Sequence, residues 1–234
     1  MSSLLAFPNY LAYSNKIWGG TKRTYRVLTD SNADSGQGLI AAKHYLEREG
    51  IKNCWLAYFG SADPGYYNLP CKLLPDSFSG WWDNPTEIAP ENLQGTLLVG
   101  ATEPAGVYWG PGELNPYGQF LTLEPVKILG GSILVFQGRF HLPAASARAR
   151  LDRIWGLELT RQMDEAIAQA NAAVELAPRM VYAHYALGYL LAMRNHKVAA
   201  LDEYQTALHL ARTVHPEYQW YWVPFLEKLI NGIR

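Results

Sequence analysis

The C-terminal part of the chain, residues 141–234, repeats itself with a period of 34 residues. The coincident pairs are Ala149 with Ala183, Leu157 with Leu191, Ala166 with Ala200, Ala173 with Ala207, Leu176 with Leu210, and Ala177 with Ala211. Ala and Leu recur there at helical spacing, and small residues at matched positions are typical of helices that cross closely. The period therefore predicts two units, residues 147–180 and 181–214, each made of two antiparallel helices.

These two units resemble tetratricopeptide repeats, a family whose repeat has the same length. The second unit carries the signature residues Leu187, Gly188, Ala200, Tyr204 and Ala207. The first unit is degenerate, because Arg153-Ile154 stands where Leu-Gly is usual. A plain helical bundle in which Ala and Leu coincide by abundance is the alternative. Since each repeat contacts only its neighbours, two units rarely stand alone, and we expect a capping helix over residues 217–230.

The first helices of the two units are predicted to line an aromatic groove. In the repeat register, Tyr182, Tyr185 and Tyr189 fall on the inner face of one helix, and Trp155 and Leu159 come from the preceding unit. Inner helices of tetratricopeptide repeats form a concave groove that binds peptides, so the resemblance implies a protein or peptide partner. An equally good interpretation is that these rings pack against the N-terminal domain and do not line a groove.

The residues before 141 follow a different pattern, in which Gly and Pro separate short β-branched and aromatic runs. We predict strands at residues 25–28, 53–59, 96–101 and 132–136, an amphipathic helix at 38–48, and a helix-like stretch at 7–17. Near-continuous apolar runs such as Ile133-Leu134-Val135 fit strands that are buried on both faces. The sequence thus predicts a three-layer α/β domain over residues 1–140, followed by an all-α helical repeat domain over 141–234, and an α+β fold overall.

Composition and charge argue against several classes of function. Twenty Lys and Arg residues balance 21 Asp and Glu residues, which leaves no excess positive charge for binding nucleic acid. The six histidines are scattered singly, and Cys54 and Cys71 lack a CxxC spacing, so we expect no metal and no cofactor. The longest apolar run, 181–193, is too short to span a bilayer. The spacing of the two cysteines is compatible with a disulfide between them and also with two buried free thiols.

Several motifs in the first third of the chain point to a second family. They are Asn9–Asn15, Gly19-Gly20, Asp30–Gln37, Leu56–Gly60 and Ala62–Tyr67. Together they resemble the soluble C-terminal segment of bacterial membrane glycosyltransferases that are similar to the protein O-mannosyltransferases. Ser35 stands where family members usually have Trp, and the membrane part that carries the catalytic acidic residues is absent from this sequence.

The resemblance implies a soluble, non-catalytic part of an enzyme that takes a sugar from a polyprenyl-phosphate carrier. Such a part would lie outside the cytoplasmic membrane. The N-terminus carries no apolar region typical of a signal peptide, so without a membrane-bound parent we expect the chain to be cytoplasmic.

Four polar residues form the candidate ligand site of the N-terminal domain: Asp30, Asn32, Asp34 and Gln37. They lie between a predicted strand and the predicted helix at 38–48, where α/β sheets present ligand clefts. Short polar side chains there suit sugar hydroxyls, although Asp and Asn also form turns and cap helices. Tyr66 and Tyr67 lie in a Gly- and Pro-rich loop and offer aromatic faces to a sugar ring, or else hold the loop itself in place.

The leading hypothesis is a non-catalytic accessory module that mediates protein or glycan contacts for a membrane glycosyltransferase-like protein. One alternative is a stand-alone carbohydrate-active enzyme that uses the cleft of Asp30, Asn32 and Asp34. Another is a cytoplasmic scaffold that captures peptides in the helical groove. No catalytic residue is identified, because Ser35 is not in a GxSxG elbow and residues 106–112 do not match a phosphate-binding loop.

Overall fold

The computed structural model describes residues 24–26, 38–60, 62–75, 87–106, 109, 115–214 and 219–233 of the 234-residue chain. The chain divides into two compact units, Met1–Ala145 and Ser146–Arg234. The first unit contains a mixed five-stranded sheet, and the described part of the second unit is helical. The fold is therefore α+β overall, as the sequence predicts. None of the described helices has the length and apolar character needed to cross a membrane.

The sheet of the first unit has the strand order β2-β1-β3-β5-β4. The strands are β1 (Cys54–Ala57), β2 (Cys71–Leu73), β3 (Asn92–Gly100), β4 (Lys127–Leu129) and β5 (Ile133–His141). β1 pairs in parallel with β2 and β3, whereas β5 pairs antiparallel with β3 and β4. The sequence predicts β1, β3 and β5 but not β2 or β4, because three residues are too few to show a period.

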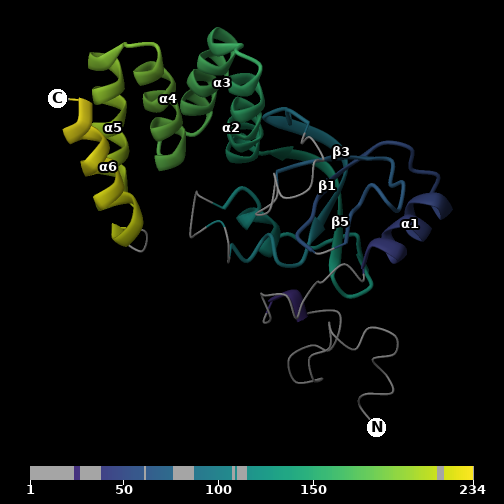
Figure 1. Cartoon of the computed structure of the whole chain (residues 1–234). Helices are drawn as coiled ribbons and strands as arrows, with labels where there is room; N and C mark the ends of the chain where they lie inside the picture. Colours follow the sequence, from purple (N-terminus) through teal and green to yellow (C-terminus); the bar gives the residue numbers. More distant parts are fainter. Residues whose placement is uncertain are drawn as a thin grey trace. The chain divides into compact units, whose positions relative to one another are not determined.

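The two faces of the sheet are buried against different parts of the first unit. Helix α1 (Gly38–Arg48) covers one face, where Leu39 and Ile133 are fully buried in a common core (Figure 1). The opposite face is covered by loops and by the 3₁₀ turn η6 (Gly118–Leu121), whose Phe120 is also fully buried. The near-continuous apolar runs of the central strands thus serve two separate clusters, one on each face.

The strand predicted at residues 25–28 is wrong at the positions that are described. Thr24–Arg26 form a single 3₁₀ turn, η4. Tyr25 is buried and Arg26 is exposed, and Arg26 donates a hydrogen bond to Glu124 at 2.6 Å. A buried ring followed by an exposed cation gives the same alternation as a strand, which explains the error. Residues 27–37 and the predicted helix-like stretch at 7–17 lie outside the described residues.

Cys54 and Cys71 form a disulfide that joins β1 to β2. The two residues are direct partners in the parallel register, and their Cα atoms are 4.3 Å apart. The sequence leaves their redox state open because a separation of 17 residues does not show that both lie on paired strands. The bond ties the three-residue edge strand β2 to the rest of the sheet.

The second unit is built from consecutive helices (Figure 1). They are α2 (Pro143–Leu159), α3 (Met163–Leu176), α4 (Val181–Met193), α5 (Lys197–Thr213) and α6 (Gln219–Ile233). Residues of α2, α3 and α4 share one core cluster, and residues of α4, α5 and α6 share another. Gly188 of α4 lies so close to Tyr204 of α5 that a Cβ atom would come within 2.7 Å of the ring. A small residue is therefore required at this crossing.

The turns after α2 and α4 have the same backbone geometry and lie 34 residues apart. Arg161 and Asn195 both adopt positive φ values, 61° and 62°. In both turns the N–H of the following residue donates a hydrogen bond to the carbonyl five residues earlier. Gln162 donates to Leu157 at 2.8 Å, and His196 donates to Leu191 at 2.9 Å. A left-handed residue with such a bond is a common helix ending. These two turns thus share a backbone geometry at the interval of the sequence period.

Candidate functional site

Aromatic side chains from three helices form a continuous layer on the second unit, which we call the aromatic face. Its residues are Trp155 of α2, Tyr182, Tyr185 and Tyr189 of α4, and Tyr221, Trp222 and Phe225 of α6. Centroids of contacting rings in this layer lie 5.3–6.3 Å apart. The structure thus brings together the groove residues that the sequence predicts on α2 and α4.

Helical spacing explains why these rings share one surface. Tyr182, Tyr185 and Tyr189 are three and four residues apart, so they lie along one side of α4. Tyr185 is the centre of the layer, because it contacts rings of both α4 and α6. Beneath it, Tyr204 of α5 is only 2% exposed, and its ring is stacked with that of Tyr185 at 6.4 Å. The aromatic face therefore rests on the packed core of the unit.

Hydrogen bonds hold the rings of α2 and α4 in place. The indole Nε1 of Trp155 donates to the hydroxyl of Tyr182 at 3.1 Å. The hydroxyl of Tyr189 donates to the carboxylate of Glu158 at 3.0 Å. These bonds restrict the side-chain rotamers, so the rings are arranged before any ligand binds.

Burial raises the pKa of Tyr182, Tyr185 and Tyr189 above the ordinary value near 10. The hydrogen bond to Glu158 raises the pKa of Tyr189 further. Burial also raises the pKa of Tyr204 to about 12. All four hydroxyls therefore remain neutral at physiological pH, and the rings present no phenolate charge.

Part of the aromatic face and its margin is open to solvent. Trp155 is 42% exposed and Tyr221 is 51% exposed, and beside them Leu159 and Trp220 are 86% and 78% exposed. Large apolar side chains gathered on one surface are typical of interaction sites. Tyr and Trp are also the residues most often found at energetic hot spots of protein interfaces.

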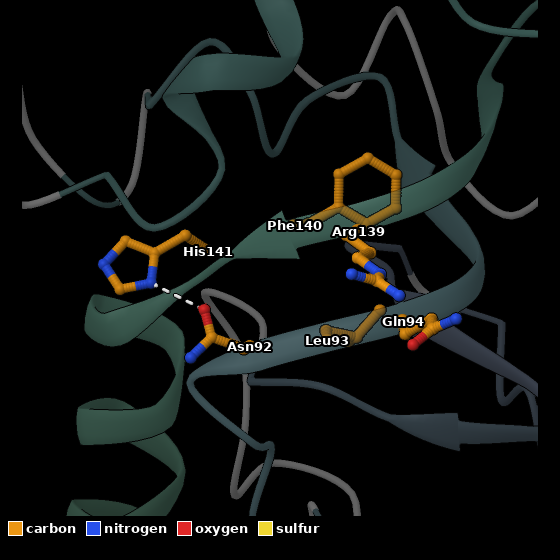
Figure 2. A pocket seen from close by; sticks show the side chains of 6 residues that line it. All are labelled: Asn92, Leu93, Gln94, Arg139, Phe140 and His141. Atoms are coloured by element: carbon orange, nitrogen blue, oxygen red, sulfur yellow. Dashed lines mark hydrogen bonds between the residues drawn. The ribbon is translucent and has the colours of Figure 1, made fainter.

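A second candidate is a hollow of about 580 Å³ at one end of the β3–β5 ribbon. Figure 2 shows the side chains that line it. Its lining residues are Asn92, Leu93, Gln94, Arg139, Phe140 and His141. His141 Nδ1 lies 3.1 Å from Asn92 Oδ1, and Gln94 is directly opposite Arg139 in the register. The four polar side chains are exposed, and an antiparallel ribbon with one hydrated face accounts for them.

The candidate ligand site of the N-terminal domain lies outside the described residues, since it consists of Asp30, Asn32, Asp34 and Gln37. Tyr66 is 79% exposed and Tyr67 is half-buried, and their rings meet edge to face at 5.3 Å. The preceding Asp63 accepts a hydrogen bond from the Gly65 N–H at 2.8 Å. This segment is therefore a turn stabilised by its own aspartate.

The aromatic residues of α6 and Glu158 are not among the groove residues predicted from the sequence. The signal for Trp222 and Phe225 is the same helical spacing that places the tyrosines of α4, but α6 lies outside the 34-residue period. No group of three His, Cys, Asp or Glu side chains within the described ranges could hold a metal ion.

Comparisons of the chain with protein-family models, with curated proteins and with solved structures find no match.

Proposed function

We propose that this chain is a non-catalytic binding module that captures a peptide segment of a partner protein on the aromatic face. The observation that carries this proposal is the layer of contacting rings across α2, α4 and α6, with Trp155 and Tyr221 exposed. Aromatic rings provide large apolar contact area with few rotatable bonds, so a ligand gains affinity at small entropic cost.

The helical unit is proposed to be a short tetratricopeptide stack, made of two repeats and a capping helix. Its support is the period of 34 residues, the matching turns at Arg161 and Asn195, and the close approach of Gly188 to Tyr204. In this arrangement α2, α4 and α6 are the inner helices that line a peptide groove. The aromatic face then occupies the surface on which such repeats bind their ligands.

The first unit is proposed to be the soluble three-layer domain of a membrane glycosyltransferase-like protein. The support comes from the motifs that resemble that family, two of which, Leu56–Gly60 and Ala62–Tyr67, lie at the end of β1 and in the turn that follows. The disulfide of Cys54 and Cys71 agrees with an oxidising compartment outside the cytoplasmic membrane. The chain would then recruit a partner to its parent enzyme.

The test is a peptide selection on the purified full-length chain. A phage library of random dodecapeptides is selected on the wild type, and the enriched peptides are synthesised and titrated by fluorescence polarisation. We expect Trp155→Ala to weaken binding at least about tenfold, or about 1.4 kcal/mol, because it removes an exposed anchor. Tyr66→Ala removes a ring of the other unit that is even more exposed than Trp155, and the Kd should not change.

Two results would contradict the proposal. One is that no peptide is enriched on the wild type above the Trp155→Ala background. The other is that an oligosaccharide panel raises the thermal midpoint of the chain while no peptide does, which would indicate a glycan-binding module. Far-UV circular dichroism of each variant shows whether a loss of binding reflects a loss of fold.

A further inference from the structure

The charged side chains of the aromatic face differ in whether they have a partner of opposite charge. Its guanidinium, that of Arg148, is already engaged, because its Nε lies 2.8 Å from the Asp152 carboxylate. Glu158 lies at the other end of the same helix and accepts the hydroxyl of Tyr189. Within the described part of the chain, no cation pairs with Glu158. Glu158 is therefore a carboxylate without a cationic partner in that part of the chain, close to the exposed Trp155 and Leu159.

The face already binds one cation through an aromatic ring. The guanidinium carbon of Arg148 lies 4.9 Å from the centroid of Tyr182, within the range of a cation–π contact. Trp155 offers a comparable surface, since its indole N–H is used toward Tyr182 and its ring is 42% exposed. Its ring centroid lies 5.9 Å from that of Tyr189, the tyrosine that is bonded to Glu158.

We infer that the peptide captured by the aromatic face presents an arginine or lysine side chain, seated against Trp155 and Tyr189 and paired with Glu158. This inference rests on the proposed function and specifies its ligand. The cation gains both the ring quadrupole of Trp155 and the charge of Glu158, and a neighbouring apolar residue of the peptide packs on Leu159. An acidic peptide gains neither contact, and it is repelled by Glu158.

The experiment extends the peptide selection with a variant that changes only this charge. Glu158→Gln keeps an oxygen that accepts the Tyr189 hydroxyl, so the ring arrangement is preserved while the negative charge is removed. Wild type and Glu158→Gln are selected in parallel from the same library of dodecapeptides. We expect Arg and Lys to be enriched only in the wild-type pool.

Synthetic peptides from the wild-type pool then give the size of the effect. Glu158→Gln should weaken their binding about three- to tenfold, and so should replacement of the peptide arginine by citrulline, its uncharged analogue. The Kd should also increase between about 50 and about 500 mM NaCl, because a partly exposed charge pair is screened. Glu175→Gln, which neutralises an exposed carboxylate of α3, is the matched control and should leave the Kd unchanged.

The outcomes separate this inference from the proposed function. Enriched peptides that lack cationic residues and bind wild type and Glu158→Gln equally overturn the cationic ligand, while peptide capture on the aromatic face stands. Enrichment of acidic peptides overturns it as well. If no peptide is enriched above the Trp155→Ala background, the proposed function itself fails, and the cationic ligand fails with it.

Discussion

At the scale of single residues, the surroundings of His184 determine its protonation state. The residue is 7% exposed, and both ring nitrogens face acceptors: Nδ1 lies 2.7 Å from Glu203 Oε2, and Nε2 lies 2.8 Å from the Pro178 carbonyl. A carboxylate and a carbonyl have no hydrogen to donate, so the imidazolium form of His184, which carries a hydrogen on both nitrogens, satisfies both contacts. In that form His184 joins α4 to α5 and to the turn before α4.

This geometry predicts a stability that decreases with rising pH. Burial by itself lowers the pKa of His184, but the hydrogen bonds to Glu203 and Pro178, and the charge of Glu203, raise it above its ordinary value. A raised folded-state pKa contributes stability that is complete below the unfolded pKa of about 6.5 and is lost as pH rises through the folded value. We expect the thermal midpoint of the helical unit to fall across that window.

Glu203→Gln tests the origin of this pH dependence. The variant should cost about 2 kcal/mol of unfolding free energy at low pH, because a hydrogen bond between charged groups is lost. It should also flatten the pH profile of the thermal midpoint, measured by circular dichroism from about pH 5.5 to about pH 9. A variant profile that runs parallel to that of the wild type would show that another group titrates.

At the scale of elements, two turns with one backbone geometry contain different residues. Arg161 after α2 and Asn195 after α4 both lie in the left-handed region, with φ values of 61° and 62°. This conformation costs a residue with a long side chain about 1–2 kcal/mol, whereas Asn tolerates it better. The first turn therefore carries a strain that the second turn largely avoids.

We predict opposite effects on stability when each turn is given the residue of the other turn in a single substitution. Arg161→Asn should raise the free energy of unfolding by about 0.5 kcal/mol, and Asn195→Arg should lower it by a similar amount. Both side chains are exposed, so neither change disturbs the core. Urea denaturation measures the difference. If both variants shift the free energy in the same direction, the left-handed conformation is not what distinguishes the two turns.

At the scale of the whole molecule, the two units have separate cores and only one of them contains the disulfide. The clusters on the sheet end at Ala145, and the clusters of the helical unit begin at Ala147. The bond between Cys54 and Cys71 constrains the unfolded chain of the first unit alone. Its stabilising effect is therefore confined to that unit.

Reduction of the disulfide should destabilise the first unit by about 3 kcal/mol, the value typical of a loop of this length. Hydrogen exchange followed by mass spectrometry resolves the two units. With reductant, peptides from β1 and β3 should lose protection, while peptides from α4 and α5 should not change. The double variant Cys54→Ala with Cys71→Ala should give the same pattern without reductant. An equal loss of protection in α4 and α5 would mean that the units unfold as one.

The sequence by itself determined the features that depend on local spacing. The amphipathic pattern at residues 38–48 coincides with α1, and the spacing of Tyr182, Tyr185 and Tyr189 indicates one side of a helix. The 34-residue period marks both similar turns of the helical unit. Each of these signals repeats within a few residues or at a fixed interval, so it can be found without knowing which elements meet.

Tertiary structure alone decided the contacts between residues that are distant in sequence. It paired Cys54 with Cys71 through the register of two strands, one of them too short to be recognised. It also placed Trp222 beside Tyr185 and surrounded His184 with two acceptors. Spacing along a chain records which side of an element a residue occupies. What that side touches depends on how helices cross and strands pair, and this information is not local.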